Sequence, residues 1–84
     1  MNPWIYLLDR RPGPVWRNVL ASLETAIRTR QVLTGEVLPP QRLMADFMGV
    51  HTNTVNRAMR EAARRGFVSA HTRPGTTVIA RPKT

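Results

Sequence analysis

The sequence is distinguished first by what it has little of. It contains no cysteine, which excludes disulfide bonds and thiolate metal sites. No apolar run approaches the roughly 18 residues that a membrane-spanning helix needs, and the N-terminus lacks a basic segment followed by an apolar one. A chain of 84 residues has room for one domain with a small core. These absences predict a soluble, cytoplasmic, single-domain protein with no membrane partner.

Acidic residues are also scarce. The chain has 13 basic and 5 acidic residues and a net charge of +8. Most of the surplus falls in residues 51–84, where Glu61 is the only acidic residue. A positive field concentrated in one part of a chain is typical of a protein that binds a polyanion. A solvated basic face is the alternative, and charge alone leaves it open.

The residue sets needed for catalysis or for metal binding are missing. His51 and His71 are far apart in the sequence, and neither has acidic or thiol neighbours that would complete a metal site. No combination of nucleophile, base and orienting acid is evident. The protein is therefore expected not to be an enzyme and to carry no metal.

The central stretch, Pro40 to Phe67, has the pattern of two helices joined by a tight corner. The first helix is expected over about 41–48 and to end at Gly49, because glycine adopts the left-handed conformation without a Cβ penalty. The second is expected to start near His51 or Thr52, with Thr52 as its cap, and to stop at Gly66. Its apolar positions recur at helical spacing: Val55, Ala58, Met59, Ala62 and Ala63. The opposite stripe is polar: Asn53, Asn56, Arg57, Arg60 and Arg64. This pattern predicts a helix-turn-helix.

The flanking segments complete the expected domain. Residues 1–12 form an N-terminal arm whose apolar stretch 4–8 either packs on the domain or contacts a partner. Residues 15–30 carry an apolar helical stripe, so Trp16 is expected in the core of a scaffold helix rather than as a platform for base stacking.

Two strands are expected after the second helix of the pair, over about 67–71 and 76–80, with Arg73 at the hairpin tip. A hairpin in this place is a wing, and Arg73 is expected to reach a minor groove or a phosphate. Val37 and Leu38 are expected to form a short strand, and residues 81–84 a tail. The predicted fold is α+β, mainly α with a small β-hairpin: a winged helix-turn-helix over 13–80, with three helices and a two- to three-stranded wing sheet.

Several motifs in this region share the order and spacing of one known family. They are Leu38-Pro39-Pro40-Gln41-Arg42, Met44-Ala45, Met48-Gly49-Val50, Asn53-Thr54-Val55 and Pro74-Gly75-Thr76-Thr77-Val78. With them the chain resembles the winged-helix DNA-binding domain of the GntR family of bacterial transcription regulators. Asn53-Thr54-Val55 and the run 61–68 are most similar to the MocR branch. In that branch the domain precedes an aminotransferase-like domain that binds pyridoxal phosphate, which cannot fit in 84 residues, so no cofactor is expected in this chain.

The resemblance implies a set of DNA-contacting residues: Arg42, Thr52, Asn53, Thr54, Asn56, Arg57, Arg60 and Arg73. The early residues of the second helix are expected at base edges and the later arginines at phosphates. Three alternatives stay open. Instead of contacting DNA, Arg42 is a plain surface arginine in the first alternative, and Thr54 caps the helix or packs in the second. In the third, Arg64 and Arg65 are solvated and contact nothing. The family often has Arg where this chain has Thr52, and the usual Gly and Pro are replaced by Arg30 and Thr34.

The predicted function is sequence-specific binding of double-stranded DNA as a bacterial transcription regulator, or as the N-terminal domain of one. The resemblance implies a homodimer on a palindromic operator, with half-sites about one helical turn apart. Without a second domain the chain alone is expected to be a monomer or a weak dimer. Two other functions stay open: a winged-helix module for protein interaction whose basic face is incidental, and RNA binding.

Overall fold

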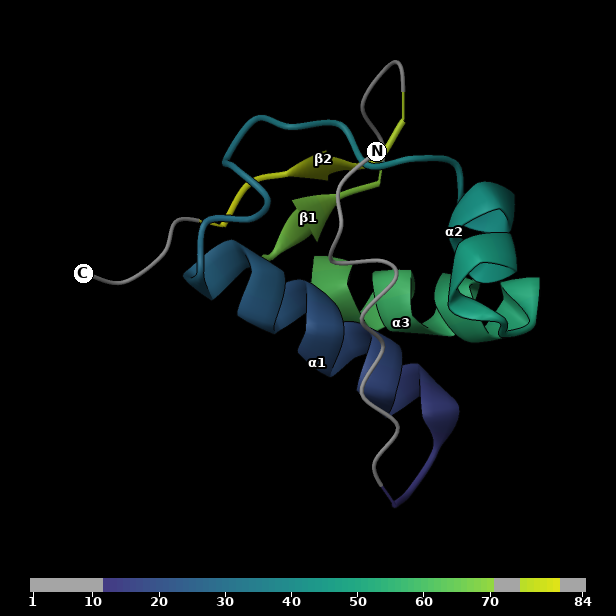
Figure 1. Ribbon diagram of the computed structural model, residues 1–84. Coiled ribbons are helices and arrows are strands. Elements are labelled where there is room, and N and C mark those ends of the chain that lie inside the picture. The colour runs from purple at the N-terminus through teal and green to yellow at the C-terminus, as the bar shows by residue number, and fades with distance from the viewer. Residues whose placement is uncertain (1–11, 71–74, 81–84) are drawn as a thin grey trace.

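The computed structural model describes residues 12–70 and 75–80. Three helices, α1 (Val15–Arg28), α2 (Gln41–Met48) and α3 (Thr52–Arg64), precede two strands, β1 (Val68–Ser69) and β2 (Thr77–Val78). In Figure 1, α1 and α3 lie on one side of the strands and α2 stands at one end of the domain. This arrangement confirms the predicted α+β winged-helix fold. The expected arm, the wing tip with Arg73 and the expected tail lie outside the described residues.

The core lies where the apolar faces of the three helices meet the strands. Leu23 of α1, Met44 of α2 and Met59 of α3 are among its largest fully buried side chains. Ala26, Ala58 and Ala62 have no exposed surface, and their small size allows α1 and α3 to pack closely. Burying a large apolar side chain contributes about 1.5–3 kcal/mol, so the core determines which face of α3 points outward.

The wing sheet is small and is held by the segment between α1 and α2. Strands β1 and β2 pair antiparallel, with Val68 opposite Val78 and Ser69 opposite Thr77. Val37 forms an isolated bridge with Thr77, and Val78 N donates to Glu36 O at 2.9 Å. The expected third strand is therefore reduced to one bridge, and both strands are shorter than predicted.

Helix α1 ends two residues earlier than predicted. It stops at Arg28, and Arg30 has a positive φ of 62°. Gln31 N and Val32 N both donate to Ala26 O, which satisfies a carbonyl of the last turn. A residue with a Cβ in this conformation costs about 1–2 kcal/mol, which is why the family usually has glycine there. Gly49, with φ 69°, ends α2 as predicted.

Among the described residues, no helix combines the length and the apolar character that crossing a membrane would need.

Candidate nucleic-acid interface

The outer face of α3 forms one wall of an open groove of about 730 Å³. Its lining comes from α1 and α3: Trp16, Asn53, Asn56, Arg57, Arg60, Glu61 and Arg64. The buried stripe of Val55, Ala58, Met59 and Ala62 occupies the opposite face of α3. The structure thus brings four of the predicted contact residues, Asn53, Asn56, Arg57 and Arg60, to one surface.

The start of α3 differs from the prediction. The N-cap residue is His51, and its Nδ1 accepts a hydrogen bond from Asn53 N at 3.0 Å. The expectation that Thr52 is the cap is therefore wrong, because Thr52 is the first helical residue and His51 holds the extended cap conformation. Thr52 and Asn53 are exposed, whereas Thr54 is half-buried at the edge of the exposed face. The cap fixes the first turn, so it fixes where Thr52 and Asn53 stand.

Helix α2 is joined to the α3 surface by a hydrogen bond between side chains. Asn56 Nδ2 donates to Gln41 Oε1 at 3.1 Å, which joins the first residue of α2 to the middle of α3. Arg42, the next residue along α2, is exposed but does not line the groove. The structure therefore separates Arg42 from the four predicted residues in the groove. The sequence analysis did not identify Gln41 as a partner, because the contact depends on how α2 crosses α3.

Trp16 of α1 carries two arginines on its ring. The Cζ atom of Arg57 lies 4.8 Å from the ring centroid, and that of Arg17 lies 5.3 Å from it. Both distances are within the range of a cation–π interaction. Trp16 was expected in the core, but it is only half-buried: it packs against the core and also lines the groove. Its contact with Arg57 was missed, since only the packing of α1 on α3 brings the two residues together.

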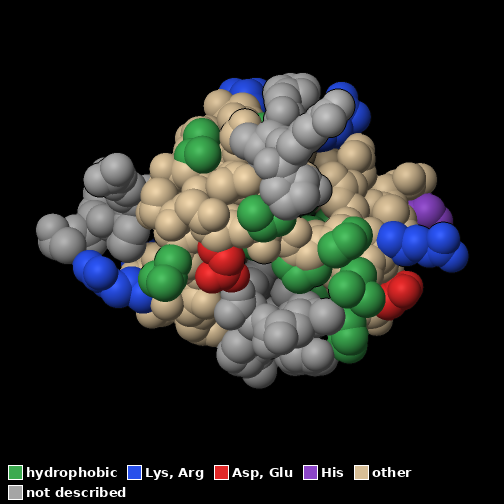
Figure 2. Space-filling model, turned by 90° about the horizontal axis from the view of Figure 1, so that it is seen from above, with side chains coloured by type: hydrophobic (Ala, Val, Ile, Leu, Met, Phe, Trp, Pro, Cys, Tyr) green, Lys and Arg blue, Asp and Glu red, His purple; other side chains and the backbone are tan. Residues whose placement is uncertain are grey.

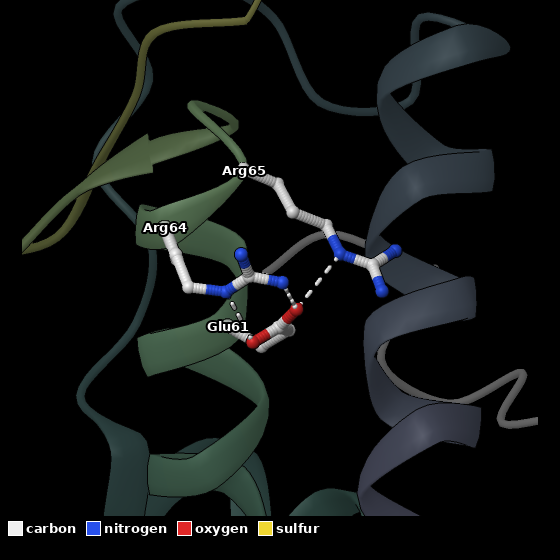
Figure 3. A network of polar contacts seen from close by, with 3 residues as sticks. All are labelled: Glu61, Arg64 and Arg65. Atoms are coloured by element: carbon white, nitrogen blue, oxygen red, sulfur yellow. Dashed lines mark hydrogen bonds and ion pairs between the residues drawn. The ribbon is translucent and has the colours of Figure 1, made fainter.

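The C-terminal end of α3 holds the ion pairs shown in Figure 3. Glu61 accepts hydrogen bonds from Arg64 Nε and Arg65 Nε, each at 3.0 Å. Hydrogen bonding from Arg64 and then from Arg65 lowers the pKa of Glu61 to about 2. The same carboxylate raises the pKa of Arg64. Arg64 and Arg65 are thus solvent-exposed but partly neutralised, which the sequence left open.

Arg57 and Arg60 are not paired with an acidic side chain among the described residues. In the part of the chain that the structure describes, the ion pairs of α3 involve Glu61 with Arg64 and Arg65. Helix α1 has no acidic residue in its first turn, next to Arg57. The groove therefore presents Arg57 and Arg60, neither of which shares an ion pair with another described residue, beside the amides of Asn53 and Asn56.

The described residues do not provide the donors for a metal or for pyridoxal phosphate. They contain no group of three His, Cys, Asp or Glu side chains that could hold a metal ion. They also contain no lysine, and a lysine amine is what holds the aldehyde of pyridoxal phosphate in its enzymes.

The sequence matches the bacterial regulatory proteins of the gntR family over residues 16–78. It is 31% identical over 75 residues to an uncharacterized HTH-type transcriptional regulator, YdeF, of Bacillus subtilis (strain 168). That alignment covers 89% of this chain but 16% of the YdeF protein, so the chain spans a small part of that relative.

Solved structures share the fold. A transcriptional antiterminator from Listeria monocytogenes EGD-e superposes with a TM-score of 0.78 at 20% identity, over 89% of this chain and 56% of that one. A GntR family transcriptional regulator from Listeria monocytogenes gives a TM-score of 0.78 at 20% identity, over 84% and 62% of the two chains. The structural likeness supports the fold, and the sequence match supplies the family. The chain belongs to the GntR family of bacterial regulatory proteins.

Proposed function

We propose that this chain binds double-stranded DNA in a sequence-specific manner and serves as the DNA-binding part of a transcription regulator. The observation that carries the proposal is the groove face of α3, where two amides and two arginines that no described acidic residue pairs with lie on one side of a helix anchored by its buried stripe. A major groove admits one α-helix, and amide and guanidinium groups are the side chains that contact bases and phosphates.

In the proposed complex the N-terminal end of α3 enters the major groove. Thr52 and Asn53 contact base edges, and Asn53 has the donor and acceptor needed to pair with adenine. Arg57 and Arg60 contact phosphates, as does Arg42 from α2. Asn56 lies on the same face between these two groups, Thr54 is half-buried at its edge, and Arg73 is expected to contact the DNA from the wing. Thr52 cannot make the bidentate guanine contact of an arginine, so the operator differs from that of relatives with Arg at this position.

The wider assembly is also part of the proposal. A homodimer on a palindromic site, with half-sites about one helical turn apart, follows the usual geometry of helix-turn-helix proteins. The placement in the MocR branch remains a prediction that rests on residues 53–55 and 61–68. A pyridoxal phosphate site, if one exists, belongs to a further domain of a longer protein.

One observation favours the alternative of a protein-interaction module. Figure 2 shows hydrophobic side chains exposed on the face seen from above. Among the described residues, the large exposed hydrophobic side chains are those of Leu33, Val37, Leu43, Phe47 and Ile79. None of the five lines the groove that contains Asn53, Arg57 and Arg60, so these residues and the α3 surface can be tested separately.

The test is a titration of labelled duplex DNA followed by fluorescence anisotropy, with a single-stranded DNA and an RNA of the same sequence as controls. About four to six phosphate contacts predict a slope of log K against log salt of roughly −4 to −5 per domain. Selection from random duplexes should then return a half-site with defined symmetry. A slope near zero, or stronger binding to the single strands, would exclude the proposed binding mode.

A further inference from the structure

Trp16 forms the α1 side of the groove. Although it belongs to the scaffold helix, its ring lies beside Asn53, Arg57 and Arg60 in the groove lining. It is half-buried, so one part of the ring packs on the core while another part faces the arginines. Two guanidinium groups, from Arg17 and Arg57, gather around this one ring.

A guanidinium that lies over an aromatic ring is still able to bind a phosphate. The ring contacts the face of the planar group, whereas the N–H donors point outward in its plane and remain available to a bidentate anion. Arg57 is exposed, so its donors are accessible to a ligand in the groove. The ring also restricts the rotamers of a long side chain before binding, which reduces the entropy that binding costs.

The charge around the ring favours an anion. The nearest acidic groove residue, Glu61, is engaged by Arg64 and Arg65, and α1 carries no acid in its first turn. Arg57 lines the groove and Arg17 does not, but both lie over the Trp16 ring, so two positive charges from two different helices meet beside the groove.

We propose that Trp16 is a positioning residue for DNA binding: it holds Arg57, and with Arg17 it extends the phosphate-binding surface from α3 onto the first turn of α1. This inference rests on the proposed function, because it assigns a further part of the same interface. It also gives Trp16 a second role beside its packing in the scaffold.

A double-mutant cycle tests the coupling. Duplex affinity is measured for Trp16→Leu, for Arg57→Ala and for the variant with both changes. Trp16→Leu should weaken binding about two- to fivefold, because binding must then order a long side chain that the ring no longer holds in place. In the Arg57→Ala background the same change should cost almost nothing further, because the ring then has no α3 arginine to hold. Trp16→Phe keeps a smaller ring and should lose less than Trp16→Leu.

The salt dependence separates positioning from charge. Arg57→Ala and Arg17→Ala should each reduce the magnitude of the salt slope by about one, whereas Trp16→Leu removes no charge and should leave the slope nearly unchanged. Duplexes with single neutral methylphosphonate linkages then locate the contact. The neutral linkage that weakens DNA binding by the wild type at the Arg57 contact should have no effect on DNA binding by the Arg57→Ala variant.

Trp16 packs on the core, so thermal unfolding of each variant is measured first, and titrations are run at a temperature where the variants are folded. Additive losses in the cycle, with Trp16→Leu costing as much without Arg57 as with it, would show a merely structural role and overturn the inference. An unchanged slope for Arg17→Ala would remove α1 from the interface. Failure of the proposed function would be distinguishable from these outcomes, because the wild type itself would then show no salt-dependent affinity for duplex DNA.

Discussion

The two ends of α3 offer different chemistry to a ligand. At the N-terminal end, Thr52 and Asn53 are exposed, uncharged and fixed by the His51 cap. At the C-terminal end, Arg64 and Arg65 share the carboxylate of Glu61. The first end is suited to contacting base edges, and the second has much of its charge already compensated. The comparison teaches that the number of arginines on a helix overstates the charge available for phosphates.

Between the two ends lie Arg57 and Arg60, which form no ion pair within the described part of the chain. Their position suits a division in which sequence is recognised at the start of the helix and the backbone is bound in its middle. Phosphate contacts orient a protein on the duplex without carrying sequence information, whereas base contacts discriminate. The variants below test whether this division along α3 is real.

The largest effect is expected for Asn53→Ala. Loss of a base contact should cost about 1–3 kcal/mol at the selected site and little on random DNA, so the ratio of the two affinities falls. Competition titrations at one fixed salt concentration measure that ratio. Gln31→Ala removes an exposed amide outside the groove and is the matched control. Equal losses on both DNAs would assign Asn53 to the backbone instead.

Arg60→Ala should lower both affinities together. At 0.1 M salt, releasing one fewer counterion costs about 1 kcal/mol, and the magnitude of the salt slope should fall by about one. Arg28→Ala removes an exposed arginine at the end of α1 that does not line the groove, so its slope should stay that of the wild type. A changed preference for the selected site with an unchanged slope would place Arg60 at a base edge and reverse the proposed docking.

Local signals in the sequence were sufficient for the helices. The buried stripe of α3, the stop at Gly49 and the apolar face of α1 follow from periodicity and from glycine's backbone freedom. The polar stripe with Asn53 and Arg60 follows from the same periodicity. The end of α1 was placed too late, because no local rule predicts that Arg30 adopts a conformation that disfavours side chains.

Contacts between helices were not predictable in the same way. The pairing of Trp16 with Arg57 and of Gln41 with Asn56 depends on how the helices cross, which the pattern of one helix does not contain. The Glu61 contacts are different, since they are separated by three and four residues and helical spacing places such residues side by side. That signal was present in the sequence and would have shown that Arg64 and Arg65 are partly neutralised.

His51→Ala tests the N-terminal end of α3, and its expected effect is smaller than those of Asn53→Ala and Arg60→Ala. Loss of the cap should lower the free energy of unfolding by about 0.5–1 kcal/mol, because Asn53 N loses its acceptor. Urea unfolding monitored by circular dichroism measures the change. His51→Ser supplies a hydroxyl oxygen as the acceptor in place of the His51 Nδ1 and should recover most of the lost stability. If His51→Ala were as stable as the wild type, the cap would not hold the first turn, and the contrast between the two ends would weaken.

Glu61→Gln tests the compensated end. Its carboxylate has a pKa lowered from 4.5 to about 2, so its contribution to stability is present above pH 4.5 and is lost as the pH falls toward 2. The wild type should therefore be more stable than Glu61→Gln at neutral pH, and the difference should vanish as the pH approaches 2. Comparing the two proteins by urea unfolding across this range isolates Glu61, since the other carboxylates titrate in both.

Glu61→Gln should also make the charge of Arg64 available to DNA phosphates. Without the carboxylate, Arg64 is free to contact a phosphate, so affinity for random DNA should rise slightly and the salt slope should steepen by up to about one. Glu24→Gln on α1 changes the net charge by the same amount without touching these arginines, and it should leave the slope unchanged. If Glu24→Gln and Glu61→Gln strengthened binding equally, the effect would come from the net charge of the whole chain. In that case the two ends of α3 would differ in structure but not in what they contribute to DNA binding.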